Sequence, residues 1–331
     1  ANNQLAIDQQ DFAAWASWSY APSDEWYHYV AASHYGDEFD MNDLGYMKRN
    51  GFDELYGSSR HDRLKYSPES SILSSTTELE YGYKRNTAGD RLSLWTGLDR
   101  TWTFRSTRSL SFEAGLIAPS NDDLVTRGNG LLATPTSYSL QTRYLSPRGN
   151  NFTYDTKVEV NYDSQQKRSL AFAFSPQLYL SETLTLGGKL GYKNLQQWLI
   201  WDFDTQQLAG FRTDRFTADV RFDWYPSSRQ EVRLKFQWVG IDATQVDSYR
   251  LNNDGSLESS NTAAADFSLG DTALQVRYRY QLAPLSNIFL VYSRGGYFAS
   301  DSGDEGGRTL LREGWNGVRV ESLIAKIRYR F

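Results

Sequence analysis

Cationic side chains recur at alternate positions in several stretches of the last third of this 331-residue chain. The final residues, SLIAKIRYRF, put three cations on one side of an extended backbone and mainly aliphatic and aromatic residues on the other. Guanidinium and ammonium groups in such an array need water, a plug or an anionic ligand to compensate their charge, and in a conducting barrel they select ions by charge. The set, called the basic wall here, is Arg221, Arg233, Lys235, Arg277, Arg279, Lys326, Arg328 and Arg330.

Carboxylates with the same alternation are more common earlier in the chain, at Glu78, Glu80, Asp155 and Glu159. The main anions close to the basic wall in the sequence are Asp219, Asp223 and Glu231. A dry, unpaired charge is too costly to keep. We therefore expect one basic wall and one more acidic wall, with the basic wall in contact with water, an acidic loop or an anionic partner.

The three histidines do not predict an active site. His28 and His34, in YHYVAASHY, share one face of an extended segment, and no local serine or acid signature accompanies them. We interpret them as aromatic-like lining residues, and His61, in SRHDR, as a solvated side chain. We expect no catalytic, cofactor-binding or metal site and no enzymatic activity, and a membrane hydrolase is kept only as a minor alternative.

We interpret two acidic segments and two glycine-containing segments as loops, bends or bulges without a binding role. DEFDMND (37–43) and SDSGDEGG (300–307) offer oxygen ligands but lack the EF-hand spacing, so we expect solvated loops. An alternative interpretation is that divalent ions bridge these loops to lipopolysaccharide phosphates. RGNG (127–130) and SRGGY (293–297) lack the strand–loop–helix context of a phosphate loop, and we expect bends or bulges.

The elements that position these side chains have a period of two almost everywhere. EVRLKFQW, ALQVRYRYQL and RFTADVRFDW each alternate apolar and polar residues over their whole length. Such alternation predicts β-strands with one apolar and one polar face, and no stretch predicts a helix. Short polar turns such as YPSSR and APLSN alternate with longer Gly/Asp/Asn-rich loops. We expect about 15 antiparallel strands in a single domain over residues 1–331.

Composition narrows the class of protein. Aromatic residues make up 15% of the chain, with 10 Trp and 22 Tyr, yet the mean hydropathy is only −0.60. No window approaches the ~18 apolar residues of a membrane helix, and ANNQLAIDQQ has no signal-peptide pattern. The absence of cysteine excludes disulfides and thiolate chemistry. A net charge of −5 disfavours nucleic acid as a partner.

The two faces of the strands favour a transmembrane β-barrel of the outer-membrane type over a soluble β-sandwich. Rings near strand ends, aliphatic residues in the middle and a polar opposite face are typical of such barrels. We expect closure with 16 or more strands, because no backbone donor is left unpaired in lipid. The bacterial outer membrane and its lipopolysaccharide are the expected surroundings. Residues expected to face lipid are Val220, Phe222, Leu234, Phe236, Val276, Tyr278, Ile327 and Tyr329.

The last strand resembles the assembly signal of bacterial outer-membrane proteins, with Tyr329 and the terminal Phe331 as its aromatic residues. That resemblance implies recognition by the outer-membrane insertion machinery. HYGDEFDMNDLGYMKRNGF (34–52), RFTADVRFDWYPSSRQEVRLKFQWVGID and SNIFLVYSRGG resemble, in order, the barrel part of a large Gram-negative outer-membrane family. The family's barrel is a domain of unknown function that follows a family-9-like carbohydrate-binding module. The resemblance implies that this module and the first part of the barrel have no counterpart here.

The direction of the strands suggests an incomplete circle. If the short turns share one end, the first and last strands run the same way, and an antiparallel seam cannot join them. We therefore expect a gap, or closure by a partner protein or by strands outside these residues. Two functions are compatible with this architecture: a porin-like transport conduit with a charged lumen, and a structural barrel that anchors a module or partner protein at the cell surface.

Overall fold

The computed structural model describes residues 11–39, 49–149, 151–163, 165 and 167–330. It contains one antiparallel sheet of 16 strands, a two-stranded sheet and one helix. Fifteen strands follow one another along the main sheet in the order β1 (Ala13–Ser23), β2 (Trp26–Tyr35), β3 (Phe52–Arg63), β4 (Ile72–Asn86), β5 (Arg91–Phe104), β6 (Ser109–Ile117), β9 (Ser137–Leu145), β10 (Phe152–Asp163), β11 (Lys167–Ser181), β12 (Leu184–Asp202), β13 (Gln207–Ser227), β14 (Gln230–Leu251), β16 (Phe267–Ala283), β17 (Ser286–Ser300) and β18 (Val318–Arg328).

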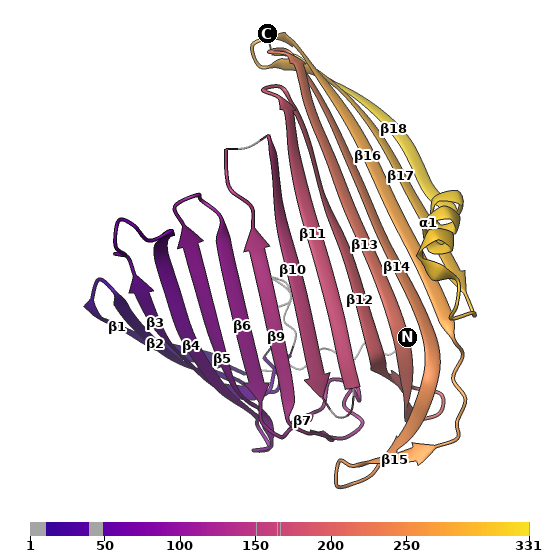
Figure 1. Cartoon of the computed structure of the whole chain (residues 1–331). Helices are drawn as coiled ribbons and strands as arrows, with labels where there is room; N and C mark the ends of the chain where they lie inside the picture. Colours follow the sequence, from indigo (N-terminus) through magenta and orange to yellow (C-terminus); the bar gives the residue numbers. More distant parts are fainter. Residues whose placement is uncertain (1–10, 40–48, 150, 164, 166, 331) are drawn as a thin grey trace.

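The connections explain this order. Tight turns such as Asp24–Glu25 and Ser228–Arg229 join successive strands as hairpins at one end of the sheet, which is the upper end in Figure 1. The longest loops lie at the other end, together with short connections such as residues 87–90 and 203–206. One of them holds the small sheet of β7 (Ser120–Asp122) and β8 (Leu132–Thr134), and another holds β15 (Leu257–Ser260), which pairs with β14. The predicted alternation of short turns and long loops is therefore confirmed.

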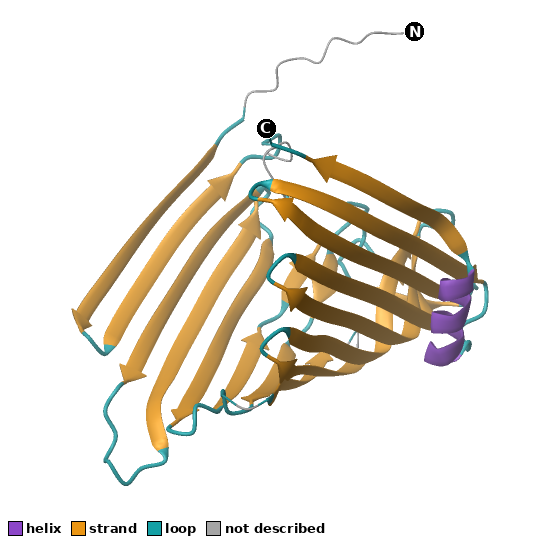
Figure 2. Ribbon diagram, turned by 90° about the horizontal axis from the view of Figure 1, so that it is seen from above, coloured by secondary structure: helices purple, strands orange, loops and turns teal. Residues whose placement is uncertain are grey.

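The main sheet curves into an open trough (Figures 1 and 2). Its edges are β1 and β18, which do not pair with each other in the described part of the chain. The expected closed barrel of 16 or more strands is thus not formed by the described residues. The physical reason is direction: β1 and β18 both run toward the end with the short turns, because they are the first and fifteenth strands of an antiparallel series. A direct ladder between them would be parallel.

Cross-strand pairing keeps each face uniform from strand to strand. Phe222, Leu234 and Val276 stand opposite one another on β13, β14 and β16, and the row continues to Tyr292 and Leu323. This apolar face lies on the convex side of the trough. Large hydrophobic side chains remain exposed across it, including Leu79, Leu140, Phe172 and Ile327. The described residues provide no second sheet that covers the face, so the sandwich alternative does not apply.

Buried apolar residues form two small clusters at the long-loop end. Leu132 packs with Leu199, Trp201 and Leu208, and Ala209 packs with Phe211 and Ala243. The strands that supply most of these side chains, β12, β13 and β14, are 19 to 22 residues long. Each is longer than the roughly 9–11 residues that a strand needs to cross a bilayer. The part of these strands at the long-loop end therefore packs its side chains into the two buried clusters.

Helix α1 (Gly306–Asn316) corrects the expectation that the chain has no helix. It lies outside the trough and crosses β14, β16 and β17 (Figure 2). Leu310 is completely buried, and the helix backbone approaches Gly270 so closely that a Cβ there would overlap the Leu310 carbonyl. Asp242 accepts hydrogen bonds from the amides of Gly306 (2.8 Å) and Glu305 (3.3 Å) at the start of the helix. Among the described residues, no helix is long and apolar enough to span a membrane.

Candidate functional site: a basic cluster on the concave face

Five members of the basic wall gather on β13, β14 and β16. Arg221 stands directly opposite Lys235, and Arg233 directly opposite Arg277. Arg279 stands opposite Glu231, one row nearer the short-turn end. Alternate residues of a strand point to one side, so all five side chains project from the polar, concave face. The structure thus brings these five predicted residues together, and we call them the basic cluster.

Glu231 organises the basic cluster. Its side chain is only 5% exposed, and its carboxylate contacts three guanidinium groups: Arg233 Nε at 2.5 Å, Arg277 at 3.0 Å and Arg279 at 3.0 Å. Asp219 pairs with Arg221 at 2.8 Å, and Asp223 lies 3.3 Å from Arg233. A single carboxylate with three guanidinium partners holds them at fixed positions and leaves a surplus of positive charge.

A cavity of about 490 Å³ opens beside this carboxylate. Four cations of the basic cluster line it, namely Arg221, Arg233, Lys235 and Arg277. The other lining groups are Asp223, the amide of Gln275 and Leu234. The arrangement can bind an oxyanion with several acceptor atoms.

The remaining three members of the basic wall lie apart from the basic cluster. Lys326 shares a cross-strand row with Arg279, but Phe289 of β17 stands between them. Arg328 pairs in register with Asn287, and the Arg330 amide donates to the Ser286 hydroxyl beyond the end of β18. All three side chains are exposed at the sheet edge. The eight cations therefore do not form one continuous wall.

The more acidic wall lies on the concave face of the first half of the sheet. Glu78, Asp99 and Glu113 stand opposite one another on β4, β5 and β6, and the row continues through Gln141 to Glu159. Asp99 and Glu113 were missed, although LSLWTGLDRTWTF and SLSFEAGLI alternate like the other strands. Glu80 accepts a hydrogen bond from Tyr56, Glu159 pairs with Lys157 at 3.0 Å, and Asp155 pairs with Arg143 at 2.6 Å.

The histidines and the predicted loops form no catalytic or metal site in the described residues. His28 contacts Ser59 at 3.0 Å and His34 contacts Asp53 at 2.7 Å, both on the convex face, and no serine–histidine–acid array results. His61 lies 3.9 Å from Glu25. No group of three potential metal ligands occurs in the part of the chain that is described.

The four loop segments differ in outcome. Residues 40–43 of the first acidic segment lie outside the described residues. Segment 300–307 leads into α1, which begins at Gly306, instead of forming a free loop. Gly128 and Gly130 adopt positive φ angles of 81° and 123°, as a bend requires. A register shift falls between Gly295 and Gly296, as expected for a bulge.

Seven of the residues expected to face lipid, all except Tyr329, belong to the convex, apolar face by their strand register. Tyr329 follows the end of β18. Phe236 differs from the others because Trp315 of α1 lies against its ring, with 6.1 Å between centroids. Ile327 and Tyr329 are 69% and 57% exposed. The assembly-signal residue Phe331 lies outside the described residues.

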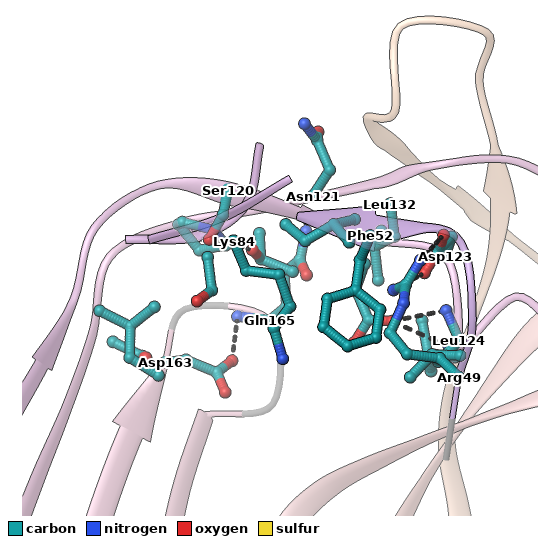
Figure 3. Close-up of a pocket in the computed structure, with 18 of the residues that line it drawn as sticks. Arg49, Phe52, Lys84, Ser120, Asn121, Asp123, Leu124, Leu132, Asp163 and Gln165 are labelled. Atoms are coloured by element: carbon teal, nitrogen blue, oxygen red, sulfur yellow. Dashed lines mark hydrogen bonds and ion pairs between the residues drawn. The ribbon is translucent and has the colours of Figure 1, made fainter. Parts of the chain in front are cut away.

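A second cavity, of about 560 Å³, lies at the long-loop end of the concave face (Figure 3). The loop between β6 and β9 covers it. Asp123 of this loop forms a two-pronged ion pair with Arg49, at 2.9 and 3.0 Å. The Ala133 amide donates to the Gly255 carbonyl at 2.9 Å, and Gln165 donates to the Ala133 carbonyl. The loop therefore ties together three other loops that lie far apart along the sheet, and we call it the bridging loop (residues 118–136).

Comparison with known proteins assigns this chain to a family. A family model described as "Domain of unknown function (DUF5916)" matches residues 7–305. No curated protein matches the chain. Among solved structures, the siderophore receptor PirA from Acinetobacter baumannii is similar, with 10% sequence identity and a TM-score of 0.43. The match covers 96% of this chain and 63% of the receptor, so this chain spans less than two thirds of that protein.

Proposed function

This chain belongs to the family of DUF5916 domains, and we propose that it forms most of the wall of a β-barrel in the bacterial outer membrane. In this proposal the convex face contacts lipid and lipopolysaccharide. The concave face lines a water-filled conduit through which charged solutes pass. The finer details, namely porin-like conduction and recognition of Tyr329 and Phe331 by the insertion machinery, are part of the same proposal.

The observation that carries the proposal is the uncovered apolar face. Exposed leucine, valine and aromatic side chains continue across the sheet from β1 to β18. A water-soluble domain would bury such an area, because contiguous exposed apolar patches rarely exceed a few hundred Å². Lipid is the simplest cover for a convex surface with hydrogen-bonded strands and a polar opposite face.

Conduction is tested in planar bilayers with the purified chain together with whatever strands complete its barrel in the native protein. A triple variant with Glu in place of Lys235, Arg277 and Arg279 should shift the reversal potential in a salt gradient toward cation selectivity, because three positive charges on the path become negative. The matched control replaces Arg85, which is exposed at the long-loop end, by Glu. An unchanged reversal potential in the triple variant would remove the basic cluster from the conducting path.

A second function is favoured by the bridging loop. Its contacts with three other loops obstruct the long-loop end of the concave face, as in a barrel that anchors a module or partner protein and carries no current. A silent bilayer recording with the wild-type chain, and current after Arg49→Gln and Asp123→Asn, would support a plugged anchor. Current of equal size in both would favour the open conduit.

The location can be tested independently of conduction. We expect the full-length protein in the outer-membrane fraction, resistant to extraction by alkali. Recovery in the soluble fraction would contradict the lipid contact. The proposal assigns the chain no catalytic role and no nucleic-acid partner, and the family-9-like module belongs to the proposal only as a neighbouring domain of the same family.

A further inference from the structure

We propose that the cavity beside Glu231 is a binding site for an oxyanion that carries at least two negative charges, such as a diphosphate. The inference deepens the proposed function and rests on it in one respect: the concave face must be open to water. It names the class of solute that the conduit holds or selects.

The first argument is the pairing of like charges. Arg221 and Lys235 stand directly opposite each other on neighbouring strands, and so do Arg233 and Arg277 in the next row. Like charges in such positions, with Cβ atoms roughly 4.5–5.5 Å apart, destabilise a sheet. Two adjacent pairs of this kind need compensation. Asp219 and Asp223 provide part of it through their contacts with Arg221 and Arg233.

The second argument is the position of Glu231. A buried carboxylate among three arginines fixes the guanidinium groups before any ligand arrives. Fixed donors lose little conformational entropy on binding, so they bind more tightly than mobile ones. Glu231 is a positioning residue, and the cavity-lining cations are the ligand contacts.

The third argument is the charge and size of the cavity. Four cations and one carboxylate line a volume of about 490 Å³, within the usual range of ligand sites. Alternate residues on one strand are about 7 Å apart, and cross-strand partners about 5 Å. The four cations therefore span an area too wide for one small monovalent ion to contact. Two linked phosphate groups match both dimensions, and the Gln275 amide adds a neutral donor.

The test is pyrophosphate binding by the detergent-solubilised protein, measured by isothermal titration calorimetry at pH 7.5. Arg277→Gln should raise the Kd for pyrophosphate about tenfold, the effect of losing one charge-assisted hydrogen bond. Lys235→Gln should also weaken binding severalfold. Among the described residues its one ion contact, to Asp219, is 4.0 Å long, so this variant should fold and keeps the test valid if Arg277→Gln fails to fold.

The matched control is Arg143→Gln. Arg143 is an exposed arginine on the same concave face, paired with Asp155 on the acidic half and away from the cavity. We expect its Kd to be unchanged. Citrate, titrated in parallel, distinguishes phosphate from carboxylate recognition. Absence of pyrophosphate binding by the wild-type protein, or equal Kd values for all the variants, would overturn the proposal, and chloride competing as well as pyrophosphate would reduce the cavity to an unspecific counterion site.

The outcomes separate this site from the conduit. Pyrophosphate binding that depends on Arg277 and Lys235 in a protein that carries no current would keep the site and refute conduction. Current that is indifferent to pyrophosphate, in a wild-type protein that shows no calorimetric binding, would keep the conduit and refute the site.

Discussion

Replacement of Glu231 by Gln should destabilise the sheet more than any other charge-neutralising change on the concave face. The glutamine has the same size, so the change removes the charge while keeping the packing. Loss of one partner from a fully buried ion pair costs about 3–5 kcal/mol. The Glu231 carboxylate is buried, but its three guanidinium partners are 40–46% exposed, and water compensates them in part. We therefore expect the free energy of unfolding to fall by about 2–3 kcal/mol.

The measurement is urea-induced unfolding of the protein in phospholipid vesicles, followed by tryptophan fluorescence. Glu113→Gln is the matched control, because Glu113 is exposed on the same face and its carboxylate accepts one hydrogen bond, from Gln141 at 2.8 Å. We expect the control to change stability by less than about 0.5 kcal/mol. In the double variant Glu231→Gln with Arg277→Gln, part of the loss should be recovered, since the second change removes one unpaired cation. If Glu231→Gln and Glu113→Gln were equally stable, the three-arginine arrangement would contribute nothing, and the organising role of Glu231 would be refuted.

Three further changes test other parts of the structure. Val276→Arg should cost about 2–4 kcal/mol of stability in vesicles if the convex face contacts lipid near the bilayer midplane, and a neutral result, with Lys235→Arg disruptive, would mean that the faces are assigned backwards. Leu310→Ala should cost about 2–3 kcal/mol and expose α1 to limited proteolysis, because the side chain is completely buried against the sheet; unchanged protease resistance would argue against docking of the helix. The amides of Glu38 and Phe12 hold the pKa of Asp11 below its usual 3.8, so this contact is present above about pH 4 and should be lost as the pH falls through the lowered pKa. The measurement is hydrogen exchange of the Glu38 amide, expressed relative to its intrinsic exchange rate at each pH: this protection should fall between pH 6 and the lowered pKa in the wild type and stay constant in Asp11→Asn.

The strands were predictable because their signal is local. Alternation in EVRLKFQW or ALQVRYRYQL specifies which residues share a face without any knowledge of the neighbours. The helix was not predictable in this way. Its glycines at 306, 307 and 314 weaken the local preference for a helix. Its stability comes from Leu310 against Gly240 and Gly270, and from Asp242, which are distant in the sequence.

The candidate site was predictable only in part. The sequence assigns Arg233, Arg277 and Arg279 to the polar face, but it does not specify which of them stand opposite one another. That depends on the register of β13, β14 and β16, which the turns between the strands determine. The same limit explains why Lys326, Arg328 and Arg330 were predicted to share one basic wall with the five residues of the basic cluster, although β17 separates them from it.

The shared direction of β1 and β18 restricts how this sheet can be completed. A second copy in the same membrane orientation would bring its β1 beside β18 of the first, and these two strands would again be parallel. Rotational symmetry about the barrel axis therefore cannot close the ring with antiparallel ladders throughout, whatever the number of copies. An antiparallel ring that contains this sheet needs an odd number of additional strands between β18 and β1. If one strand completes the ring, it must run toward the end with the long loops. Its apolar side chains must point outward, and its polar side chains must point inward, to the face that carries the basic cluster.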